Sequence, residues 1–347
     1  MTARPLSVAL AALTLLPLLV GGSVAAETPT EPLVIGAIVN KAAGCASGGS
    51  TDVDAMRFAV AQINAAGGVN GLPVELHDAD GKCSVAGARA AFNSLRTNLG
   101  ATAILFTGTD AQLAELAKLA EQTQTVLVAA RAGGTNATAG KDYLFTARVH
   151  PFNLTEGVAM VEQATKTDGG PYQVVYMGDD YGYDVVLGIV NSLEGVGAQY
   201  RDPIGIDPLA PKYLEAATQV AMVAETTDFD TVLFAGDAEQ LGGFVQALHD
   251  IAGLDSVDLY APGAAYGAHL FVGNDGTGKS LVDDVVIVGI ALNPSLHSTT
   301  STFLTDYVEA VGSEANVYAE YAYDAVAVVA LAAETADDHS GPGIQQY

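Results

Sequence analysis

Short apolar runs alternate with amphipathic segments of helix length along most of this chain. The first run, LVIGAIV at 33–39, is rich in β-branched residues and predicts a strand that is buried on both faces. Apolar residues at spacings of three and four then predict a helix over 51–65, with Thr51 and Asp54 as a capping pair at its start. A second strand follows, LPVELHDAD at 72–80. A helix between two hydrophobic strands is typical of the parallel crossover unit of an α/β sheet.

The same alternation continues toward the end of the chain and forms two sets. Further strands are expected at 101–106, 125–130, 143–151, 173–177, 198–206, 230–236, 257–263 and 283–294. Helices are expected at 85–99, 113–120, 153–165, 183–194, 212–225, 239–251, 301–311 and 318–334. Two α/β sets joined by a short strand predict two doubly wound α/β lobes, connected by a hinge, with a cleft between them.

Ligands of open α/β sheets bind beyond the carboxyl ends of the strands. In the first set these ends lead into the loops 40–50, 107–111 and 131–137, where we therefore expect a site. The second loop opens a helix, whose N-terminus favours an anion such as a carboxylate. Asp110 there is either a ligand contact or the helix N-cap. Arg131 could neutralise a ligand carboxylate, or it could pair with one of the many acids at the surface.

The N-terminus has the layout of a secretory signal peptide. Arg4 is followed by the apolar run LSVALAALTLLPLLVGG and by the small residues SVAA, which predicts a signal peptide at 1–26 with cleavage after Ala26. An uncleaved membrane anchor is the alternative. No later apolar run is long enough to span a bilayer. We therefore expect the mature chain to be exported to the periplasm or the cell exterior, soluble and without membrane insertion.

The chain is strongly acidic. Its 40 acidic and 14 basic residues give a formal net charge of −26, and loss of Arg4 with the signal peptide would make it −27. A surface this negative repels nucleic acid and anionic lipid, so neither is an expected partner. Such a charge suits solubility at high salt, where self-repulsion is screened, and it suggests a salt-rich habitat.

The sequence offers no expected catalytic or metal site. Residues 273–280, GNDGTGKS, match the nucleotide P-loop pattern, but a strand pattern follows the loop where phosphate binding needs a helix. The match is interpreted as chance, with Lys279 a surface residue. The six histidines have no metal-like spacing, and no Gly-x-Ser-x-Gly elbow occurs. We therefore expect no cofactor, no metal and no enzymatic activity.

Two cysteines lie in the expected exported part, each just past one of the first two strands. Cys45 and Cys83 are the only cysteines in the chain. An exported pair so placed favours a disulfide over a metal site, because two thiols alone ligate zinc poorly.

The segment AVAQINAAGGVNGLPVELHDADGKCSVAGARAAFNSL, at 59–95, resembles the type I periplasmic-binding-protein family, in particular its branched-chain amino acid and amide group. YLFTARVHP at 143–151 and DDVVIVGIALNP at 283–294 resemble the family's crossovers between lobes, and YAEYAYDAVAVVALAAE at 318–334 resembles its C-terminal helix. The resemblance implies an N-terminal lobe of 33–148 plus 291–347 and a C-terminal lobe of 149–290. It also implies that several C-terminal strands of the family are missing after GIQQY.

The resemblance further implies ligand-binding residues in both lobes. The turn at 107–110 is similar to the family's serine-bearing turn, which places Thr109 or Asp110 at the ligand. AARAGGTN resembles the loop that grips the ligand head group, with Thr135 at its threonine and Arg131 nearby. Cys83 matches a family position that a disulfide ties.

In the expected second lobe, GDDYGYD resembles a segment whose tyrosine, here Tyr181, closes over the ligand. The acid that holds the ammonium group in amino-acid binders is absent from APGAAYG. Asp237, in FAGDAEQ, could replace it, and Tyr266 could line the same wall.

These observations favour an extracytoplasmic protein that captures a small polar solute, such as an amino acid, an amide or a small carboxylate. The resemblance implies delivery to the permease of an ABC transporter, and we expect a monomer. A sensor of the same fold that reports to a receptor is the first alternative. A P-loop nucleotide-binding enzyme and a structural surface protein are alternatives of other classes.

Overall fold

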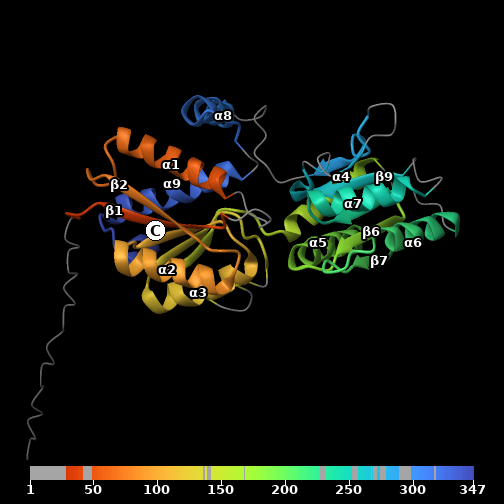
Figure 1. Ribbon diagram of the computed structural model, residues 1–347, viewed down its shortest axis with the longest axis horizontal. Coiled ribbons are helices and arrows are strands. Elements are labelled where there is room, and N and C mark those ends of the chain that lie inside the picture. The colour runs from red at the N-terminus through yellow and green to blue at the C-terminus, as the bar shows by residue number, and fades with distance from the viewer. Residues whose placement is uncertain are drawn as a thin grey trace, which may run out of the picture.

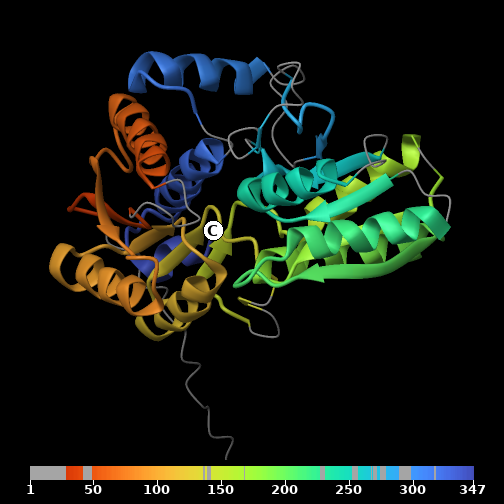
Figure 2. The same ribbon diagram turned by 45° about the vertical axis from the view of Figure 1, so that its right-hand side comes forward.

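The protein has two α/β lobes, each built around a five-stranded parallel sheet (Figures 1 and 2). The computed structural model describes residues 29–41, 49–135, 137–138, 142–167, 169–226, 231–251, 257–266, 268, 272–273, 279–288, 298–315 and 318–347. Within these residues no helix combines the length and apolar character needed to cross a bilayer.

The first sheet has the strand order β2-β1-β3-β4-β5, with every pair parallel. Its strands are β1 (Leu33–Val39), β2 (Val74–Asp80), β3 (Ala103–Phe106), β4 (Val126–Ala129) and β5 (Thr146–Arg148). Helices α1 (Ser50–Ala65) and α9 (Ala319–Ala336) cover one face, and α2 (Val85–Leu99) and α3 (Asp110–Thr123) cover the other (Figure 1). One continuous apolar core joins both faces of this sheet to these helices.

The second sheet has the order β10-β9-β8-β6-β7. Its strands are β6 (Tyr172–Met177), β7 (Tyr200–Ile206), β8 (Thr231–Ala235), β9 (Asp258–Pro262) and β10 (Val286–Val288). Helices α4 (Leu154–Thr167) and α5 (Asp180–Val196) pack on one face, and α6 (Tyr213–Thr226) and α7 (Ala238–His249) pack on the other. Read from β6 as the first strand, this is the same 2-1-3-4-5 order as in the first sheet.

The C-terminal helices return to the first lobe. Helix α8 (Ser298–Val311) places Phe303 and Tyr307 against Phe58 of α1, with ring centroids 6.1 and 5.8 Å apart, and α10 (Gly341–Gln345) follows α9. In Figure 1 these blue helices lie with the red and orange N-terminal elements. The chain therefore crosses between lobes more than once, as a hinged architecture requires.

The apolar periodicity predicted the type and order of these elements correctly except for the short α10, which it did not predict, and the other errors are local. The Thr51–Asp54 capping pair is wrong, because α1 begins after Gly49 and has no side-chain cap. Part of the expected crossover at 283–294 forms β10, which pairs with β9, and residues 289–297 lie outside the described residues. The signal peptide at 1–26 and Cys45 also lie outside them, so the signal peptide and the Cys45–Cys83 disulfide stay predictions.

Candidate functional site

The carboxyl ends of β1 and β3, where ligands of such sheets bind, are joined by a buried glutamine. Gln112 is 1% exposed, and its side-chain amide donates to the Gly81 and Ser84 carbonyls at 3.2 and 3.1 Å. Its carbonyl accepts the Asn40 amide at 3.0 Å and the Thr109 N–H at 3.0 Å. The protein's own polar groups therefore fill this strand junction.

The second lobe repeats this arrangement. Gln240 accepts the Asp237 N–H at 2.8 Å and donates to Asp179 at 2.8 Å, which joins the carboxyl ends of β6 and β8. Both glutamines belong to a capping box, begun by Thr109 in α3 and by Asp237 in α7. Thr109 and Asp237, two of the predicted ligand residues, are thus helix N-caps in the described structure.

Asp110 is the first residue of α3 and not its N-cap. Its carboxylate accepts the Gly134 N–H at 2.7 Å, and burial raises the pKa of this carboxyl, opposed by that hydrogen bond. A Cβ on Gly134 would lie 2.2 Å from the Asp110 carboxyl carbon, so glycine is required for the approach. Arg148 of β5 donates to the Ala132 carbonyl at 2.7 Å. The predicted head-group loop is therefore fixed to the first lobe by side chains on both sides.

Thr135 connects this loop to the second lobe. Its N–H donates to Asp184 of α5 at 2.9 Å, and its hydroxyl donates to the other carboxylate oxygen at 2.5 Å. The Asn153 N–H, just before α4, donates to the Gly133 carbonyl at 2.9 Å. The loop at 131–135 thus lies at the boundary between the lobes.

Arg131, in the same loop, forms an ion pair with Asp52. Its Nη1 lies 3.6 Å from Asp52 Oδ2, and Asp52 is fully buried in the first turn of α1. The guanidinium carbon lies 3.8 Å from the ring centroid of Tyr318, within cation–π range. Arg131 is therefore a largely buried cation that pairs with an acid, as one of the two alternatives predicted, but that acid is buried and not at the surface.

His150 lies against the same tyrosine. Its ring centroid is 5.6 Å from that of Tyr318 and 4.9 Å from that of Tyr321. Burial, together with the smaller effect of the charges of Arg131 and Arg148, lowers the pKa of His150 to about 4. The imidazole is therefore neutral at pH 7, and its Nδ1 makes no hydrogen bond with the described residues.

Glu156 and Tyr181, both in the second lobe, lie near Tyr318. Glu156 of α4 is 5% exposed and accepts the Gly263 N–H at 2.7 Å. Burial raises its pKa, and the hydrogen bond from Gly263 opposes that rise. The buried Tyr181 hydroxyl lies near Glu156, and burial and this carboxylate together raise its pKa. This hydroxyl makes no hydrogen bond of ordinary geometry with the described residues.

We call these six residues the Tyr318 cluster: Asp52, Arg131, His150, Glu156, Tyr181 and Tyr318. Arg131 Nη1, His150 Nδ1 and the Tyr181 hydroxyl are buried there without a hydrogen bond to the described residues. Buried polar atoms of folded proteins are rarely left without a hydrogen bond, because each such atom lowers the stability of the fold by about 1–3 kcal/mol. A donor fork, a neutral imidazole and a phenol next to two carboxylates can bind a small polar or zwitterionic molecule.

The remaining expected residues lie elsewhere. Tyr266 is 70% exposed. Lys279 donates to both oxygens of Asp284 at 2.6 and 2.5 Å, and a turn and then β10 follow where a P-loop needs a helix. The described residues contain no group of three or more His, Cys, Asp or Glu side chains that could hold a metal.

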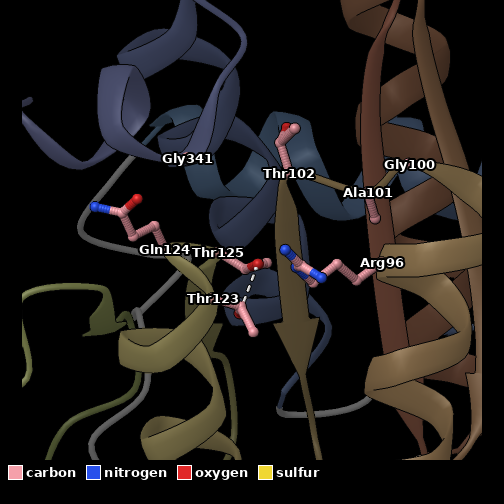
Figure 3. A pocket seen from close by; sticks show the side chains of 8 residues that line it. All are labelled: Arg96, Gly100, Ala101, Thr102, Thr123, Gln124, Thr125 and Gly341. Carbon is pink, nitrogen blue, oxygen red and sulfur yellow. Dashed lines mark hydrogen bonds between the residues drawn. The ribbon is translucent and has the colours of Figure 1, made fainter.

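A cavity of about 260 Å³ lies at the opposite ends of β3 and β4, beneath α10 (Figure 3). Arg96 points into it, and the hydroxyls of Thr123 and Thr125 are 3.0 Å apart at its wall. None of the predicted site residues lines this cavity.

Sequence reasoning missed Tyr318, Glu156, His150, Asp52 and Asp184 as site residues. Tyr318 opens the segment that resembles the family's C-terminal helix, which is a signal that could have identified it. Glu156 and Asp184 lie inside ordinary helix patterns, and only the packing of the two lobes brings Asp184 to the 131–135 loop.

Comparison with known proteins agrees with this architecture. The sequence profile of the family described as periplasmic binding protein matches residues 32–346. No curated protein sequence matches the chain. Similar solved structures include an ABC transporter substrate-binding protein from Desulfitobacterium hafniense in complex with Leu, at a TM-score of 0.76 and 19% identity over 91% of this chain and 88% of that chain.

Two further structures have similar folds. The branched-chain amino acid transporter substrate binding protein from Streptococcus pneumoniae, in complex with isoleucine, has a TM-score of 0.72 and 20% identity, covering 91% of this chain and 87% of its own. A solute binding protein from Rhodopseudomonas palustris, in complex with 3,4-dihydroxy benzoic acid, has a TM-score of 0.74 and 18% identity, covering 90% and 84%. The resemblance to the type I group is thus confirmed in the fold and in the sequence profile. The chain belongs to the periplasmic binding protein family.

Proposed function

We propose that this protein is an extracytoplasmic solute-binding protein whose ligand occupies the Tyr318 cluster. One observation carries the proposal: buried polar atoms from both lobes converge on Tyr318 without hydrogen bonds to the described residues. A ligand that supplied those partners would stabilise the form in which the lobes approach each other. Capture would then shift the lobes toward a closed form.

The ligand proposed for this site carries a carboxylate. Arg131 Nη1 lies in a largely buried position where a carboxylate could accept from the guanidinium. Leucine, isoleucine and 3,4-dihydroxy benzoic acid, the ligands of the three similar structures, share that group. An amino or hydroxyl group of the same ligand would lie toward Glu156, which supplies the acid that the sequence lacks at the expected position. Asp237 is less suited to that role because it caps α7.

The wider account follows from family membership. We propose that the chain is exported by its signal peptide, that Cys45 and Cys83 form a disulfide, and that the mature protein acts as a monomer without enzymatic activity. It would deliver its ligand to the permease of an ABC transporter. The lobes would be 33–148 plus 291–347 and 149–290. A sensor that reports to a receptor would use the same site, and copurification with a permease would separate the two roles.

A thermal-shift screen of the mature protein in high salt tests this proposal. The panel contains amino acids, amides, urea, short and aromatic carboxylates, and nucleotides. A ligand of the native state raises the melting temperature by mass action, by about 2.7 kcal/mol of stabilisation at a hundredfold excess over its dissociation constant. We expect a shift with one class of small carboxylate, reduced in Arg131→Lys because lysine lacks the bidentate fork. A shift with nucleotides alone, or a carboxylate shift that Arg131→Lys leaves unchanged, would contradict it.

A further inference from the structure

The Asp184 carboxylate forms two hydrogen bonds between the lobes. It lies on α5 in the second lobe and is 4% exposed, yet both of its oxygens accept from one residue of the first lobe. The Thr135 N–H donates to one oxygen at 2.9 Å, and the Thr135 hydroxyl donates to the other at 2.5 Å. A charged acceptor makes these bonds stronger than neutral ones. This two-point contact joins the lobes directly, without the chain crossings.

The loop that Asp184 holds is stiff on its own side. Asp110 accepts from Gly134, and Arg148 donates to the Ala132 carbonyl and, at 2.9 Å, to the Thr138 hydroxyl. A displacement of Asp184 is therefore transmitted to the first lobe instead of being absorbed by a loose loop.

We propose that the Asp184–Thr135 contact is a latch between the lobes. It stabilises the lobe separation of the described structure, and wider separations require both hydrogen bonds to break. The latch depends on the geometry of α5 and the 131–135 loop, and not on which solute the protein binds. Asp184 is thus a positioning residue whose effect is on the distribution of lobe separations.

Small-angle X-ray scattering of the ligand-free protein tests the latch. Asp184→Ala is expected to increase the maximum dimension and broaden the distance distribution, because more open forms become populated. Asp180→Ala is the matched control: it removes an exposed acid from the first turn of the same helix and should leave the scattering curve unchanged. A residue with a merely structural role would lower the melting temperature without changing the scattering of the folded protein.

A second pair of variants tests the same contact from the first lobe. Thr135→Val removes the hydroxyl donor at nearly constant volume and should broaden the distribution in the same direction, whereas Thr135→Ser retains both donors and should match wild type. These variants decide the question if Asp184→Ala fails to fold. Scattering of folded Asp184→Ala or Thr135→Val that superimposes on wild type, or an equal change in Thr135→Ser, would overturn the latch.

Discussion

Replacing Arg131 with methionine should lower the free energy of unfolding of the ligand-free protein by about 3 kcal/mol. The change removes the guanidinium group that pairs with the fully buried Asp52 carboxylate. Loss of one member of a buried pair typically costs about 3–5 kcal/mol. We expect the lower end, because the first turn of α1 favours a negative charge. Chemical denaturation at constant high salt measures the loss.

The double variant Arg131→Met with Asp52→Asn separates this effect from simple packing. If the loss comes from an uncompensated charge, the second change should restore most of the stability that the first removed. Additive losses in the two single variants would contradict a coupled pair.

A similar loss, about 2–3 kcal/mol, is expected for Gln112→Leu. This change removes the partner of Asn40 and of the Gly81 and Ser84 carbonyls in a buried strand junction. Gln240→Leu is the matched control, since Gln240 occupies the equivalent place in the second lobe but is only half-buried. We expect the Gln240→Leu loss to be smaller, and equal losses measured by urea denaturation would contradict the account of burial.

Lowering the pH should reduce the free energy of unfolding through His150. Its folded-state pKa of about 4 lies below the ordinary 6.5, so the unfolded chain binds more protons between these pH values. The stabilisation is therefore complete above pH 6.5 and is lost as the pH falls toward 4, by about 3 kcal/mol. His150→Gln should remove this part of the pH dependence of the unfolding free energy. Equal acid sensitivity of His150→Gln and wild type would contradict the burial of His150.

Hydrophobic periodicity was sufficient for the fold because both sheets are covered on both faces. Buried strands such as β1 and β8 read as continuous apolar runs, and the helices between them have one apolar face. Pro203 did not prevent β7 from forming, since β7 is an edge strand. The predicted Thr51–Asp54 capping pair was wrong because both residues lie inside α1, whose N-cap is Gly49.

A short internal repeat was present in the sequence and was not recognised as one. FTGTDAQ at 106–112 and FAGDAEQ at 234–240 share a phenylalanine, a glycine and a glutamine at the same spacing. In each lobe the glutamine is the capping-box residue that joins two strand ends. Thr109 and Asp237, both predicted as ligand contacts, begin these two capping boxes, and their role in ligand binding stays a prediction.

The position of the 131–135 loop between the lobes could be predicted from sequence, but its contacts could not. Arg131 and Thr135 do lie where the lobes meet, as the family resemblance implied. Their partners, Asp52, Tyr318 and Asp184, come from helices 49 to 187 residues away in sequence. Such contacts depend on how two lobes pack, which a local pattern does not encode.

The most direct test of the central claim is calorimetric titration of the Tyr181→Phe variant with the solute found by the thermal-shift screen. The Tyr181 hydroxyl makes no hydrogen bond of ordinary geometry with the described residues, so its removal should leave the free energy of unfolding unchanged or slightly higher. If the ligand is the missing partner, the same change should weaken binding about tenfold, the equivalent of about 1.4 kcal/mol. Unchanged affinity, or a loss of stability with no loss of affinity, would contradict a ligand site at the Tyr318 cluster.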